Sequence, residues 1–98
     1  IAPIIEISAP LIVRAGKPIV LRGSLQPRIN NISLVVEKLV NGVWQKVPLK
    51  NTYTSDLDGS FSIALTEVNE GFATYRVRSV ATATLESGLS SSVNIVIQ

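Results

Sequence analysis

The stretch YTSDLDGSFSI, residues 53–63, decides how the rest of the chain is interpreted. Two short runs in which polar and apolar residues alternate meet there at Asp58-Gly59. An Asp-Gly pair between such runs favours a tight turn, because glycine adopts positive φ angles without strain. Phe61 and Ile63 fall on one face of the second run, and Ser62 falls on the other. The stretch therefore predicts a β-hairpin with one face turned toward a core.

Runs of the same kind recur on both sides of this hairpin. Pro10 interrupts the first of them, which is typical of an edge strand because proline has no backbone N–H. Asn41-Gly42 marks a second tight turn, and no apolar stripe of helical period is present. Besides the central hairpin, strands are expected at 4–8 with 11–14, 19–25, 32–38, 43–50, 73–82 and 93–97.

This spacing predicts an all-β fold, an antiparallel β-sandwich of about seven strands. In such a sandwich the apolar residues of each strand alternate toward the space between the sheets. The side chains expected to face that core are Ile19, Leu21, Leu34, Val36, Phe61, Ile63, Tyr75, Val77, Val93 and Ile95.

Composition narrows the function classes. The 98 residues, 46% of them hydrophobic, suffice for one domain spanning residues 1–98. The chain begins at Ile1 without an initiator methionine and both ends are strand-like, which predicts a domain excised from a larger protein. Cys, His and Met are absent, which removes thiol nucleophiles, imidazole acid–base pairs and the usual zinc ligands. We therefore expect a protein that is not an enzyme and uses no cofactor.

Charge and edge residues restrict the partners. The net charge is +2, with seven basic and two acidic side chains in residues 1–50 and two basic and five acidic ones in residues 51–98. Because the basic residues form no contiguous cluster, we expect no nucleic-acid binding. No apolar run reaches the roughly 20 residues that span a bilayer, so we expect no membrane insertion. Pro3, Pro10 and Pro48 protect the expected edges, and 11–14 can cover the last strand, which favours a monomer.

Two pairs of residues are candidates for binding. Asp56 and Asp58 could supply oxygen ligands to Ca²⁺, but two carboxylates are too few alone, and a plain turn is the favoured interpretation. Trp44 and Tyr53 could stack on a sugar, although a single Trp beside apolar strand residues more often fills a core or its rim. A flat face exposing both rings would favour a sugar site.

The segment around Tyr75 resembles a known family. Leu65, Gly71 and Tyr75-Arg76-Val77-Arg78 resemble the strand E to strand F corner of immunoglobulin-like and fibronectin type III domains. The wider pattern, GKPIVLRG at 16–23, VEK at 36–38, NGVW at 41–44 and residues 54–61, resembles bacterial immunoglobulin-like repeats. The antibody Cys pair is missing, and Trp44 lies one strand later than the strand C tryptophan, which favours the bacterial or fibronectin-like variants.

This resemblance implies an immunoglobulin-like sandwich in which the hydroxyl of Tyr75 bonds to the backbone of the corner. It implies a structural, spacer or adhesion module of a bacterial extracellular or cell-surface protein, without catalytic residues. The partners would be neighbouring domains of the same chain, or a protein or glycan at the cell surface. The alternative is a carbohydrate-binding β-sandwich module appended to a secreted enzyme.

Overall fold

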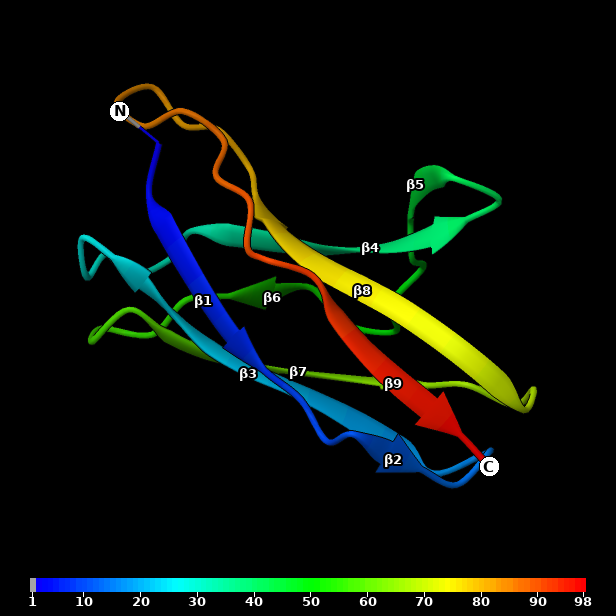
Figure 1. The fold of residues 1–98 in the computed structure, drawn as a ribbon. Coiled ribbons are helices and arrows are strands. Elements are labelled where there is room, and N and C mark those ends of the chain that lie inside the picture. Colours follow the sequence, from blue (N-terminus) through cyan, green and yellow to red (C-terminus); the bar gives the residue numbers. More distant parts are fainter. Residues whose placement is uncertain (1) are drawn as a thin grey trace.

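β-Strands account for all the regular structure of residues 2–98 in the computed structural model, and this described range contains no helix (Figure 1). The all-β prediction is confirmed. Residues 2–98 contain nine strands instead of about seven, in part because the first expected strand is divided in two. The strands are β1 (Ile4–Ser8), β2 (Ile12–Val13), β3 (Pro18–Gln26), β4 (Ser33–Val40), β5 (Val43–Lys46), β6 (Tyr53–Thr54), β7 (Ser60–Thr66), β8 (Gly71–Ser79) and β9 (Val93–Ile97).

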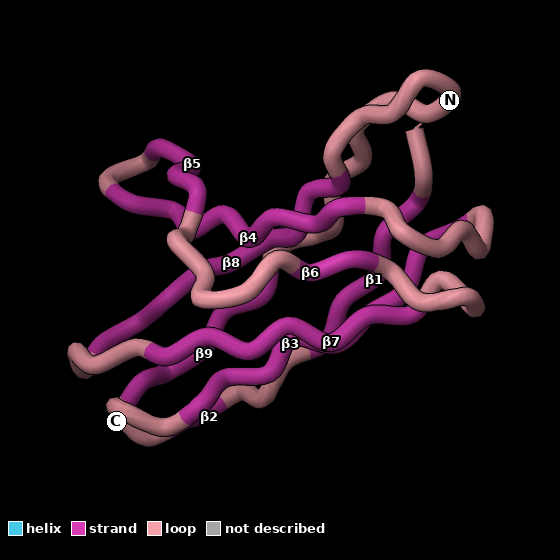
Figure 2. The backbone as a smooth tube through the Cα atoms, turned by 180° about the vertical axis from the view of Figure 1, so that it is seen from behind, coloured by secondary structure: helices cyan, strands magenta, loops and turns pink. Residues whose placement is uncertain are grey.

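The strands form two sheets that pack as a sandwich (Figures 1 and 2). The smaller sheet has the order β1-β3-β7, and the larger has the order β2-β9-β8-β4-β5, with β6 also paired to β4. All neighbouring strands are antiparallel except β2 and β9, which are parallel. Strands β5 and β6 pair with successive parts of β4, so the chain between them leaves and rejoins the larger sheet.

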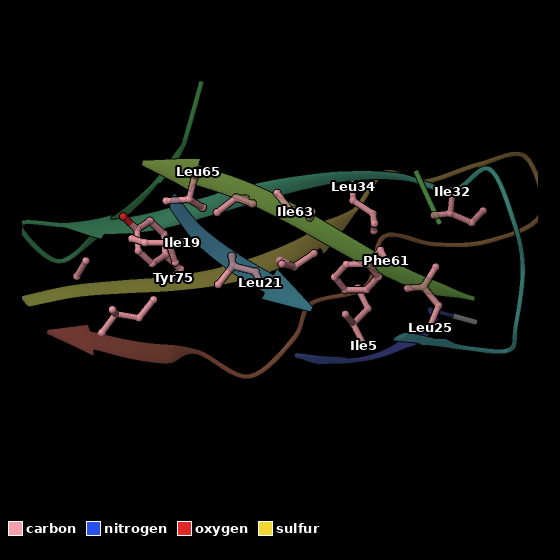
Figure 3. Packing of buried hydrophobic residues seen from close by; sticks show 14 of the residues in the cluster. Ile5, Ile19, Leu21, Leu25, Ile32, Leu34, Phe61, Ile63, Leu65 and Tyr75 are labelled. Atoms are coloured by element: carbon pink, nitrogen blue, oxygen red, sulfur yellow. The ribbon is translucent and has the colours of Figure 1, made fainter. Parts of the chain in front are cut away.

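The core lies between the two sheets and follows the predicted alternation (Figure 3). Tyr75 lies beside Ile19 at one end of the cluster, and Phe61 lies near Ile5 and Leu25 toward the other. Burying an aliphatic or aromatic side chain of this size stabilises a fold by about 1.5–3 kcal/mol. Every expected inward residue is buried except Val93, which is half-buried against the cluster.

The central hairpin prediction is wrong, although its turn is correct. Asp56 N–H donates to the Ser60 carbonyl at 2.8 Å, and Gly59, at φ 79°, donates to the Asp56 carbonyl at 2.9 Å. The flanking strands then separate, because β6 pairs with β4 of the larger sheet and β7 pairs with β3 of the smaller one. The turn therefore carries the chain from one sheet to the other.

The second predicted hairpin is confirmed, but its second strand is shorter than expected. Strands β4 and β5 are joined by Asn41 and Gly42, with φ angles of 51° and 79°. The strand ends at Lys46 instead of residue 50, and a last hydrogen bond joins Val47 N–H to the Val36 carbonyl at 2.8 Å. Pro48 follows and has no N–H to continue the ladder. Strand β8 likewise ends early, at Ser79 instead of residue 82.

The N-terminal strand divides at Pro10, as its sequence predicts. Strand β1 belongs to the smaller sheet, and β2 crosses to the larger one and covers β9. Val96 N–H donates to the Leu11 carbonyl at 2.8 Å, and Gln98 N–H donates to the Val13 carbonyl at 2.9 Å. The expected cover of the last strand is therefore confirmed.

Gly23 occupies a position in β3 where no side chain fits. It pairs with Ile7 of β1 and Phe61 of β7. A Cβ atom at this position would collide with the Glu6 carbonyl oxygen and lie 2.7 Å from Cζ of Phe61. The Phe61 ring thus fills the space that the inner face of β3 leaves open.

Candidate functional site

The two aromatic candidates, Trp44 and Tyr53, lie on the same side of β4 but on opposite faces of the larger sheet. Trp44 of β5 pairs with Leu39, and Tyr53 of β6 pairs with Leu34. Leu34 points into the core, and Leu39, five residues later, points outward because side chains alternate along a strand. The two rings therefore do not form one flat platform for a sugar.

Tyr53 joins the two sheets at their open side. Its hydroxyl donates to the Ala64 carbonyl of β7 at 3.3 Å and accepts from the Ala64 N–H at 3.4 Å. Both groups belong to the free edge of the smaller sheet, since β7 has β3 on its other side. Tyr53 thus satisfies backbone groups that an edge strand otherwise leaves exposed, which is a structural role.

Trp44 stacks against an arginine on the outer face of the larger sheet. The guanidinium carbon of Arg76 lies 4.2 Å from the centroid of the Trp44 ring, which is the geometry of a cation–π contact. The indole is half-buried, and Arg76 covers one of its faces. The sequence did not predict this contact, because it depends on which strands are neighbours.

One carboxylate holds Arg76 and its neighbour Arg78 together. Arg76 Nε donates to Glu37 Oε1 at 2.7 Å, and Arg78 Nε donates to Glu37 Oε2 at 3.3 Å. The Glu37 side chain is only 13% exposed. Burial acts to raise the pKa of Glu37, but the hydrogen bonds and positive charges of the two arginines outweigh it and hold the pKa below its ordinary value. Glu37 is therefore ionised at neutral pH.

Lys46 completes a basic cluster, which we define as Glu37, Trp44, Lys46, Arg76 and Arg78. Lys46 of β5 pairs with Glu37 in the strand register and is exposed. Two arginines are bonded to the carboxylate and one lysine lies opposite Glu37 in the strand register, so the cluster carries a formal charge of +2. The alternation of β4 and β8 placed Glu37 and the arginines on outer faces, but only the pairing of these strands shows that they meet.

A small hollow adjoins the basic cluster where the chain leaves β5. Its volume is about 290 Å³, and the residues that line it include Val35, Lys46, Pro48, Leu49, Asn51 and Thr52. Val35 pairs with Arg78 across β4 and β8, so the hollow continues from the cluster. The shortness of β5 creates it, since residues 47–52 loop away from the sheet before β6 rejoins it.

The two aspartates predicted as calcium ligands are exposed and serve the turn between β6 and β7. Asp58 Oδ1 accepts from the Ser60 hydroxyl at 2.6 Å and from the Ser60 N–H at 3.0 Å. These bonds lower the pKa of Asp58. Within residues 2–98, no group of three or more acidic side chains gathers as metal ligands. The turn itself explains the geometry of Asp56 and Asp58.

The Tyr75 hydroxyl differs from its prediction. The residue is fully buried, and its hydroxyl has no hydrogen-bond partner among residues 2–98, so the expected bond to the corner backbone is wrong. Lys38 lies above the ring, 6.0 Å from its centroid, and pairs with Glu67 at 2.8 Å. Burial and the nearby Glu67 carboxylate raise the pKa of Tyr75. Sequence alternation alone did not predict that the Lys38–Glu67 ion pair covers Tyr75 at the end of the core.

The comparisons with known proteins assign no family. No protein-family model matches the chain, and the search of curated proteins finds no similar sequence. None of the described residues belongs to a helix long and apolar enough to cross a membrane. The basic cluster and its adjoining hollow are therefore the candidate site on geometry alone.

Proposed function

We propose that this chain is a non-catalytic spacer and adhesion module of a bacterial extracellular or cell-surface protein. The observation that carries the proposal is the placement of the two ends of the described chain. They lie at opposite ends of an elongated sandwich, 40 × 26 × 21 Å in extent (Figures 1 and 2). When a chain enters a domain at one end and leaves it at the other, the domain separates its neighbours by roughly its own length.

The strand order supports an immunoglobulin-like arrangement. In immunoglobulin-like sandwiches the strands that follow one another in sequence divide between two sheets by Greek-key connections. Here the first, third and seventh strands form one sheet, and the other sheet has the order β2-β9-β8-β4-β5. The division of the N-terminal strand between the two sheets places its second half beside the last strand.

This arrangement suits a spacer under tension. A pull on the two ends draws β2 and the parallel β9 in opposite directions, so their hydrogen bonds are loaded together in shear. The bonds that carry this load are Val96 N–H to the Leu11 carbonyl, Gln98 N–H to the Val13 carbonyl, and Ala15 N–H to the Gln98 carbonyl. Bonds loaded together resist a higher force than bonds broken one after another. We propose that the module acts as a monomer joined to neighbouring domains of its own chain.

Single-molecule pulling between residues 2 and 98 tests the spacer role. We expect one cooperative unfolding event, with Val96→Pro lowering the unfolding force because it removes the N–H that bonds to Leu11. Asn94→Pro is the matched control, because residue 94 lies two positions earlier, and its N–H points to the same side without contacting β2. Extension without a resisting event, or equal forces for the two variants, would contradict the proposal.

The two-ring sugar platform of the alternative function lacks support. Trp44 and Tyr53 lie on opposite faces, Arg76 covers one face of the indole, and the Tyr53 hydroxyl is bonded to β7. An adhesive contact must therefore use other chemistry on this surface.

A further inference from the structure

The two arginines of the basic cluster are fixed and still free to bind. Both use Nε for their bonds to Glu37, and the hydrogen bonds found among residues 2–98 leave their Nη groups without a partner. The guanidinium of Arg76 also rests on Trp44. Fixing these side chains in advance lowers the entropy that a ligand must otherwise overcome, and the Nη groups offer paired donors for an anion.

Charge complementarity determines the sign of the ligand. The cluster carries a formal charge of +2, and its only carboxylate is already bonded to both arginines. Lys46, on the neighbouring strand, is exposed and forms no ion pair within the described residues. A ligand with a negative group at this position gains from Arg78 and Lys46 without displacing an acidic side chain of the protein.

The adjoining hollow determines the size and the polarity of the ligand. Its volume of about 290 Å³ lies near the lower limit for small-ligand pockets, which suits one sugar ring better than a larger group. Asn51 and Thr52 offer amide and hydroxyl groups to sugar hydroxyls, while Pro48 and Leu49 offer apolar contact to a ring face. Lys46 belongs to both the hollow and the basic cluster.

We propose that the outer face of the larger sheet binds a carboxylated glycan, with one uronic acid ring in the hollow and its carboxylate on Arg78 and Lys46. A planar carboxylate matches the guanidinium fork, and the cluster already holds one carboxylate, that of Glu37. Single-stranded nucleic acid needs an open aromatic face for its bases, whereas Arg76 covers one face of Trp44. This inference rests on the proposed adhesion role and names its ligand class.

Calorimetric titration with a tetramer of galacturonic acid at about 0.15 M salt tests the site, because weakly held surface charges are screened at this ionic strength. We expect saturable binding that a neutral galactose tetramer does not reproduce. Arg78→Gln and Lys46→Gln should each weaken binding about tenfold, since each removes one charge-assisted contact. Arg78→Gln leaves Glu37 bonded to Arg76, so the fold is retained.

Two control variants carry the same change in charge at other places. The controls are Arg22→Gln and Lys17→Gln. Arg22 lies on the exposed face of β3 in the smaller sheet, and Lys17 lies in the turn before that strand. Both should leave the affinity unchanged within about twofold, because they are remote from the hollow. Circular dichroism of all four variants checks the fold.

Several results would overturn the proposal. These are absence of binding to the uronic acid tetramer, equal weakening by all four variants, or equal affinity for dextran sulfate or single-stranded DNA. Equal weakening would indicate general attraction to a basic protein. A negative binding result does not change the expected result of the pulling experiment. The spacer role and the glycan site are therefore tested independently.

Discussion

The two sheets resemble each other on their inner faces and differ on their outer ones. Inside, both contribute buried aliphatic and aromatic side chains to one core. Outside, the smaller sheet presents mainly small neutral residues, with Ser24 paired to Ser60 and Val20 paired to Ala64. The larger sheet presents the basic cluster. Stability therefore depends on both sheets, whereas the chemistry suited to a ligand is concentrated on one outer face.

The largest expected effect is on the free energy of unfolding, and it compares a substitution on the inner face of a sheet with one on an outer face. Phe61 of β7 is buried, and Phe72 of β8 is 87% exposed. Phe61→Ala should lower the free energy of unfolding by about 3–5 kcal/mol because it leaves a cavity. Phe72→Ala should change it by less than about 0.5 kcal/mol. Urea denaturation of both variants measures the difference, and similar losses would contradict the assignment of faces.

A second substitution tests how closely the smaller sheet is packed. Gly23→Ala should cost about 1–3 kcal/mol or more, because the new methyl group meets the Glu6 carbonyl and the Phe61 ring. Ser62→Ala, on the exposed face of β7, should be nearly neutral. Chemical denaturation compares the two. If Gly23→Ala proved as stable as wild type, the close approach of β1 and β3 would be wrong.

The pH dependence of stability tests the carboxylate of the basic cluster. The pKa of Glu37 is lower in the folded chain than its ordinary value of 4.5, so its contribution is present above that pH and is lost as the pH falls through the folded pKa. The difference in unfolding free energy between wild type and Glu37→Gln should shrink as the pH is lowered from 7 to about 3. Thermal melts across this range measure it, and a constant difference would count against the bridge.

The smallest expected effect on stability is that of replacing Tyr75, at the end of the core. Tyr75→Phe removes a buried hydroxyl that has no partner among residues 2–98. Its stability should equal that of wild type or exceed it by up to about 1 kcal/mol, because no hydrogen bond is lost. A loss of about 1 kcal/mol or more in equilibrium unfolding would mean that the hydroxyl is bonded in solution.

Alternation along the strands was sufficient to predict most of the core. Phe61 and Ile63 alternate with serine and alanine, and period-two patterning depends only on the local sequence. The turn at Gly59 was predicted for the same reason. The pairing of its flanking strands was not, because partner choice depends on distant residues, and β6 and β7 find theirs in β4 and β3.

The candidate site was only partly predictable. Trp44 was identified as a candidate, but its contact with Arg76 requires that β8, β4 and β5 be neighbours. The hollow arises from an early strand end at Lys46, where a longer strand was expected. The contact depends on long-range pairing, which a single sequence does not specify. The early strand end has a local cause, Pro48, but the shape of the hollow also depends on where β6 rejoins β4.

Backbone amide NMR tests most directly whether the two outer faces differ in function. Titration with the galacturonic acid tetramer should shift the amide signals of β4, β5, β8 and residues 47–52, and should leave those of β1, β3 and β7 unchanged. Shifts centred on the smaller sheet, or no shifts at saturating tetramer, would contradict the claim that the larger sheet carries the binding surface.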